Sequence, residues 1–216
     1  GEPAGVGPDI TLAVWRDRQR HGLPPFYCYG NAAFLSDRTR LLGIDVPIEE
    51  VAPQEAADCF DRALPVVSLD APMSAEPGEV DPANASAVIE AIAKAVGDIR
   101  SGLAGAMVTN PINKQALYQA GFRPPGHTEF LGTLSAAWTG TPGRPVMMLA
   151  GPELRAVPIT IHLPLADVPQ ALSRDLIVTT GRIVAADLKR RFGLPSPRLA
   201  VAGLNPHAGE GGAPGR

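Results

Sequence analysis

Cysteine, aromatic residues and clustered positive charge are all scarce in this chain. Its 216 residues include two cysteines, Cys28 and Cys59, and neither belongs to a Cys-x-x-Cys pair, which argues against a disulfide framework and the usual cysteine-based zinc and redox motifs. The formal net charge is −3 and no run of Lys and Arg stands out, so no general attraction to nucleic acid or anionic lipid is expected. No apolar run approaches the roughly 20 residues of a transmembrane helix, and no segment resembles a signal peptide. These absences predict a cytoplasmic protein that binds neither nucleic acid nor membrane.

Apolar residues, glycine and proline are abundant instead. The chain is 45% hydrophobic, which at 216 residues is enough for one large or two modest domains. Its 23 glycines and 23 prolines predict many tight turns. Strand-like and helix-like patterns alternate along it, so we expect an α/β fold with a mixed, largely parallel sheet flanked by helices. Helices are expected over residues 7–15, 32–42, 82–99, 110–120, 128–138 and 173–192, and strands over 26–30, 66–69, 104–109, 146–150, 154–161 and 199–204. Residues 43–80 have the weakest periodicity and are expected to be peripheral, and no boundary between domains is assigned.

Two histidines follow predicted strands that one helix connects. His162 follows the strand over 154–161, and His207 follows the strand over 199–204. A strand, a helix and a strand in this order usually form a crossover between neighbouring parallel strands, whose carboxyl ends share one edge of the sheet. We therefore expect the two imidazoles to lie close together as metal ligands. The alternative is a pair of hydrogen-bonded core or loop histidines, and a tight site needs a third ligand, for which Glu210 is the nearest candidate.

Two further segments place chemically useful side chains at predicted helix starts. In residues 125–130 (PGHTEF), His127 and Thr128 could hold a phosphate or carboxylate at free backbone N–H groups, although Thr128 could simply be the N-cap of the helix. In residues 109–114 (TNPINK), Lys114 falls in the first turn of a helix, where its charge opposes the helix dipole. That unfavourable placement makes Lys114 a candidate catalytic residue, and a solvated surface lysine is the alternative.

The glycine-rich start of the chain has no nucleotide-binding pattern. Residues 1–9 (GEPAGVGPD) lack the Gly-Lys-Ser/Thr ending of a P-loop, and neither Gly5 nor Gly7 has a glycine three positions later. A tight turn before a helix and an edge of a substrate site are both consistent with this segment.

Six motifs occur here in the order found in a known family. They are residues 1–9, 109–114, 125–130, 146–150 (VMMLA), 162–165 (HLPL) and 203–212 (GLNPHAGEGG). Together they resemble the 4-hydroxythreonine-4-phosphate dehydrogenase family of vitamin B6 biosynthesis over the whole chain. The resemblance implies a homodimer with a shared active site and two-domain subunits of the isocitrate/isopropylmalate dehydrogenase-like fold.

The resemblance also implies an activity and a set of site residues. Such an enzyme oxidises 4-phosphohydroxy-L-threonine with NAD or NADP to a 2-amino-3-oxo acid, which then loses carbon dioxide. His162 and His207 match two of three histidines that bind a divalent metal (Zn, Mg or Co), and His127 and Thr128 match a substrate-binding pair. A metal ion on the C3 oxygen would acidify the hydroxyl and polarise the resulting ketone.

The chain departs from the family pattern in several places. Family members are longer, so the chain resembles an incomplete dehydrogenase subunit, and the third metal histidine and the cofactor residues have no counterpart in it. Asn110 stands where the family has Gly or Ala. Relatives with similar motifs act on 4-phosphothreonate, on 4-phosphoerythronate or on aromatic cis-dihydrodiols, and a non-catalytic protein that binds a phosphorylated metabolite is a further alternative.

Overall fold

The computed structural model describes residues 1–124, 126–140 and 143–205. The chain divides into two compact units, Gly1–Gly143 and Arg144–Arg216. Each unit has its own secondary structure, and each is described by itself below. No helix in the described ranges is long and apolar enough to span a membrane.

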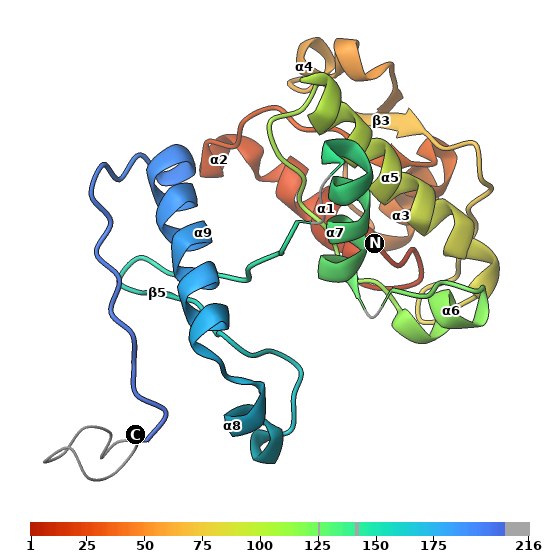
Figure 1. Ribbon diagram of the computed structural model, residues 1–216. Helices are drawn as coiled ribbons and strands as arrows, with labels where there is room; N and C mark the ends of the chain where they lie inside the picture. The colour runs from red at the N-terminus through yellow and green to blue at the C-terminus, as the bar shows by residue number, and fades with distance from the viewer. Residues whose placement is uncertain (125, 141–142, 206–216) are drawn as a thin grey trace, which may run out of the picture. The chain divides into compact units, whose positions relative to one another are not determined.

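A three-stranded parallel sheet organises the first unit, and Figure 1 labels its central strand. Its strands are β1 (Cys28–Gly30), β2 (Ile48–Glu50) and β3 (Leu64–Ser68), in the order β1-β3-β2. Cys28 lies opposite Val66, and Ile48 lies opposite Leu64. The expected α/β class with a parallel sheet is therefore confirmed.

Two helices pack on this sheet and form the first core. They are α1 (Gly7–Arg16) and α3 (Ala32–Leu42), whose ends follow local signals. Asn31 caps α3 by accepting a hydrogen bond from the backbone N–H of Phe34, and Gly43 ends it at φ 63°, a backbone conformation that favours glycine. The buried members of the core are Leu12, Trp15, Leu35, Val46, Phe60, Leu64 and Val66.

A second core in the same unit is built almost entirely from helices. It joins α5 (Ala85–Ser101), α6 (Lys114–Gln119) and α7 (His127–Thr139), and Figure 1 shows α7 beside α5. The buried members are Ala85, Val88, Ile92, Leu117 and Phe122, with Phe130, Leu131 and Leu134 of α7 packed against them. This core fixes the starts of α6 and α7, where three of the candidate site residues lie.

Short elements complete the first unit. They are α2 (Arg18–His21), η1 (Pro53–Glu55), α4 (Ala56–Cys59) and η2 (Pro82–Asn84). Asp81 caps η2 through a bond from the backbone N–H of Ala83, as its position before Pro82 predicts.

The second unit contains a hairpin and a long helix. Strands β4 (Leu149–Ala150) and β5 (Arg155–Ala156) pair antiparallel, which confirms the expected hairpin around Gly151. The helices are η3 (Leu165–Asp167), α8 (Val168–Ala171) and α9 (Arg174–Phe192). Ser173 caps α9 and Gly193 ends it at φ 66°, as the sequence predicts.

Four expectations about strands and periphery were wrong. Residues 104–109, 157–161 and 199–204 form no strand, and the Val108 side chain is 97% exposed. Residues 64–68, inside the segment expected to be peripheral, form the central strand of the parallel sheet. A strand needs partners distant in sequence, so an apolar run alone does not decide whether it joins a sheet.

Candidate functional site

Two of the motifs in the first unit are tied together at the glycine-rich segment. The backbone N–H of Glu2 donates to the Pro111 carbonyl at 2.8 Å. The Asn110 side-chain amide donates to the Gly7 carbonyl at 3.2 Å and to Thr11 Oγ1 at 2.9 Å. A Cβ atom on Gly7 would lie 2.9 Å from the Asn110 Cβ, so this close approach requires glycine. Residues 1–9, a turn followed by the first residues of α1, are thus packed against the 109–114 segment.

The side chain of Lys114 extends from the 109–114 segment to the start of α7. Lys114 is the first residue of α6, whose N-cap Asn113 accepts a bond from the Ala116 N–H at 3.0 Å. The Lys114 Nζ lies 3.3 Å from the point where a Cβ on Gly126 would be, and Glu129 Oε2 lies 3.2 Å from the same point. An ammonium group therefore reaches the beginning of α7, with a carboxylate beside it.

The first turn of α7 carries both expected substrate residues. His127 and Thr128 are its first and second residues, and the N-cap is Gly126, which has no side-chain cap bond. The alternative of Thr128 as the N-cap is therefore wrong. Because helix-start N–H groups lack partners within the helix, this end favours an anion.

His127 sits in a partly desolvated and positive environment. Its Nε2 atom is buried and has no hydrogen-bond partner among the described residues. Burial lowers the pKa of the imidazole below its ordinary value, and the positive charge of Lys114 lowers it further. The ring is therefore neutral at neutral pH and can donate one N–H to a bound anion.

Lys114→Met is expected to raise the pKa of His127 only partway toward about 6.5, because burial remains. In the unsubstituted protein the pKa of His127 is lower in the folded state than in the unfolded state, so protonation favours unfolding. The contribution of neutral His127 to stability is therefore full above about pH 6.5 and is lost as the pH falls below that value. NMR titration of the imidazole measures the pKa directly. Lys94→Met is the matched control, since Lys94 pairs with Asp70 and Glu90. An unchanged His127 pKa in Lys114→Met would contradict this placement of the ammonium group.

A cavity of about 790 Å³ runs along β1 in the first unit. Gly7, Thr109 and Asn110 are among its lining residues, as are Tyr27 and Tyr29. Both tyrosine hydroxyls donate to Asp98 Oδ2 at 2.5 Å, and burial followed by this bonding raises the pKa of each phenol. This cluster ties β1 to α5.

The sequence did not single out the Tyr27/Tyr29/Asp98 cluster or the buried Arg38. The alternation of Tyr27 and Tyr29 about Cys28 was the available signal for a shared face, but nothing local pointed to Asp98, 69 positions beyond Tyr29. For Arg38, the available signal was an arginine amid the apolar positions of a predicted helix.

His162 belongs to the second unit and does not end a strand. The nearest preceding strand, β5, ends at Ala156, so the predicted strand-edge placement of His162 was wrong. The side chain is exposed, and the backbone has φ 57°. Among the described residues, His162 is the only non-glycine residue with a positive φ. Such a left-handed backbone is strained for a residue with a Cβ and is a feature of functional loops.

The described residues do not by themselves make a metal centre. His207 and Glu210 lie outside the described residues, and within those described no group of three His, Cys, Asp or Glu side chains is placed to hold a metal ion. His162 is therefore a candidate ligand without a described companion, and the metal assignment remains a prediction.

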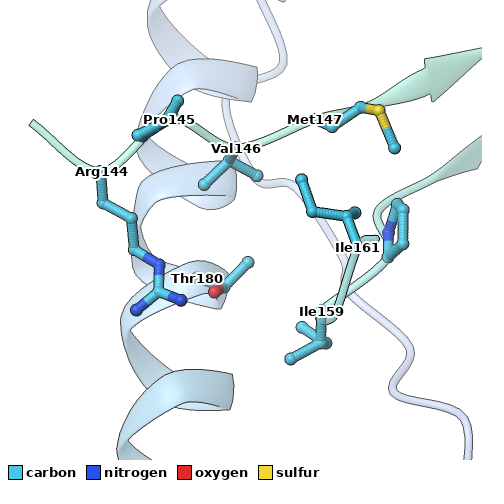
Figure 2. A pocket seen from close by; sticks show the side chains of 8 residues that line it. Arg144, Pro145, Val146, Met147, Ile159, Ile161 and Thr180 are labelled. Atoms are coloured by element: carbon cyan, nitrogen blue, oxygen red, sulfur yellow. The ribbon is translucent and has the colours of Figure 1, made fainter. Parts of the chain in front are cut away.

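A small pocket of about 90 Å³ has lining residues that are close to His162 in the sequence (Figure 2). Arg144 and Thr180 lie beside each other at one side of it, and Ile159 and Ile161 lie at the other. Thr180 comes from α9, so the pocket marks where that helix packs on the segments around 144–147 and 158–161.

Comparison with known proteins agrees with the motif order. Residues 23–216 match the family model of the pyridoxal phosphate biosynthetic protein PdxA. The chain is 51% identical to a 4-hydroxythreonine-4-phosphate dehydrogenase of Bradyrhizobium diazoefficiens, over 100% of this chain and 64% of the relative.

Two solved structures support the fold. A 4-hydroxythreonine-4-phosphate dehydrogenase from Burkholderia phymatum is 29% identical with a TM-score of 0.83, over 98% of this chain and 63% of that one. A terephthalate 1,2-cis-dihydrodiol dehydrogenase from Burkholderia xenovorans LB400, at 24% identity and a TM-score of 0.62 over 98% of this chain and 62% of that one, shows likeness of fold alone.

These comparisons confirm the expected isocitrate/isopropylmalate dehydrogenase-like fold. The chain spans 62–64% of the length of these three relatives. Since the family model matches nearly all of its residues, the chain belongs to the PdxA family of pyridoxal phosphate biosynthetic proteins.

Proposed function

We propose that this chain carries the substrate-binding and metal-binding residues of a dehydrogenase that oxidises 4-phosphohydroxy-L-threonine with NAD or NADP. The observation that carries this proposal is the convergence of Lys114, His127 and Thr128 at the start of α7. The names of the relatives, which are 4-hydroxythreonine-4-phosphate dehydrogenases, supply the reaction.

The start of α7 suits the phosphate end of such a substrate. Lys114 would pair with the phosphate, His127 and Thr128 would donate to its oxygens, and the first backbone N–H groups of the helix would complete the set. Glu129 would offset part of the positive charge, so that an anion with fewer contacts than a phosphate ester would bind more weakly. Held at one end, the substrate would present its C3–OH elsewhere, where NAD or NADP, when bound, would supply the hydride acceptor and the hydroxyl proton would pass to water. The resulting 3-oxo acid would then lose its carboxylate as carbon dioxide, with the electrons of the broken C–C bond taken up by the 3-oxo group.

The metal and the assembly belong to the same proposal. We assign His162 and His207 to a divalent metal ion (Zn, Mg or Co), a role that the strained backbone of His162 supports. A cytoplasmic homodimer with a shared active site follows from the family resemblance. Lys114 is better placed for binding phosphate than for catalysis, because its Nζ lies at the helix start.

The test is an assay of reduced nicotinamide formation by the full-length protein. We expect turnover with 4-phosphohydroxy-L-threonine plus a divalent metal, and much less with 4-phosphothreonate, 4-phosphoerythronate or an aromatic cis-dihydrodiol. A preference for one of the other substrates would replace the proposed one. Tight phosphate-ester binding with no turnover on any substrate would instead favour a binding protein.

A further inference from the structure

The glycine-rich segment over residues 1–9, which includes the start of α1, is contacted from one side by a buried arginine. Arg38 on α3 is 5% exposed, and its Nε and Nη2 atoms contact the two carboxylate oxygens of Asp9 at 2.5 and 3.0 Å. Its Nη2 also donates to the Gly5 carbonyl at 3.2 Å. A guanidinium is planar and forms several bonds in fixed directions, so Arg38 sets the positions of Gly5 and Asp9 together.

Asn110 contacts the same segment, at the start of α1, from the other side. Its amide donates to the Gly7 carbonyl and to Thr11 Oγ1, and the Glu2 N–H donates to the Pro111 carbonyl. The approach is too close for a side chain at Gly7. The 1–9 segment therefore couples the position of α3 to that of residues 110 and 111.

Lys114 lies three residues beyond Pro111, at the first position of α6. The Asn113 cap fixes where that helix begins, and the Lys114 Nζ reaches Gly126 at the start of α7. A shift of the 110–111 backbone would therefore move the ammonium group relative to the free N–H groups of α7.

We propose that Arg38 and Asn110 are positioning residues for the anion site, acting through the 1–9 segment to hold Lys114 at the start of α7. Neither residue touches the anion. This inference rests on the proposed function of Lys114, His127 and Thr128 in binding phosphate. Asn110 is the sharper probe, because its contacts are neutral, whereas removal of the buried Arg38 charge leaves Asp9 without its partner.

The experiment measures inorganic phosphate binding by NMR, from the shifts of the 127–129 amides, together with the pKa of His127. Asn110→Ala is expected to weaken phosphate binding about two- to tenfold, the range for loss of a neutral hydrogen bond, and to raise the His127 pKa as Lys114 withdraws. Arg38→Lys should do the same in part. Arg62→Met is the matched control, since Arg62 pairs with Glu49 at the surface and should change neither quantity.

A double-mutant cycle separates positioning from general destabilisation. Once Lys114→Met has removed the ammonium group, Asn110→Ala should have no further effect on phosphate affinity. The proposal is overturned if Asn110→Ala lowers only the melting temperature, or if its effect on affinity adds fully to that of Lys114→Met. If Lys114→Met itself leaves phosphate affinity unchanged, the proposed anion site fails, and this inference fails with it.

Discussion

His162→Ala in the full-length protein is expected to lose most of its bound divalent metal and nearly all turnover. Removing one protein ligand opens the coordination sphere to water, and we expect the metal affinity to fall by about 100-fold or more. Elemental analysis of the purified, folded protein measures the stoichiometry. His207→Ala should behave alike. His21→Ala is the control, because His21 is an exposed histidine of α2 outside every candidate site.

The backbone of His162 allows a second variant that separates metal binding from folding. At φ 57° a residue with a Cβ is strained, whereas glycine is not. His162→Gly should therefore be more stable than His162→Ala by about 1 kcal/mol in urea denaturation, although both lack the imidazole. Metal at wild-type stoichiometry in both variants would refute the assignment of His162 as a ligand.

Helix positions followed from short-range signals in the sequence. The helix from Ala32 to Leu42 and the helix from Arg174 to Phe192 begin at residues with capping side chains and end at glycines with positive φ. Caps and stops act within a few residues of the helix end, so they can be read from the sequence without knowing the fold. The hairpin around Gly151 could be predicted from the sequence for the same reason.

Strand positions depended on partners that the local sequence does not reveal. Leu64 to Ser68 became a central strand because β1 and β2 pair with it on both sides, although its surroundings carry little periodicity. Residues 104–109 have the more strand-like sequence, yet no strand among the described residues pairs with them. Side-chain packing against neighbours decides strand formation, and those neighbours lie far away in the chain.

The anion site shows the same division between local and distant information. The helix starts at Lys114 and His127 could be placed approximately from their motifs, but the approach of Lys114 to Gly126 depends on the packing of α5, α6 and α7. The role of Arg38 was even harder to predict from the sequence. Burial of a charged side chain makes sense only with Asp9 beside it, 29 positions earlier.

Thr128→Ala is expected to raise the KM for a phosphorylated substrate by about tenfold or more while leaving the melting temperature nearly unchanged. A lost charge-assisted hydrogen bond costs about 1.5–3 kcal/mol of binding. The effect on stability should be small, because Gly126 and not Thr128 is the N-cap of α7, and alanine is a good helix former at the second position. Steady-state kinetics and thermal unfolding on the same preparation measure both quantities.

Thr133→Ala provides the matched control for this test on the same helix. Thr133 is exposed, and its hydroxyl donates to the Glu129 carbonyl, so the substitution makes the same chemical change away from the helix start. His127→Ala should raise KM as Thr128→Ala does, since His127 is the first residue of α7 and Thr128 is the second. If Thr128→Ala and Thr133→Ala gave equal KM values, Thr128 would have no part in binding the substrate. A larger loss of stability in Thr128→Ala than in Thr133→Ala would instead return Thr128 to a structural role at the start of the helix.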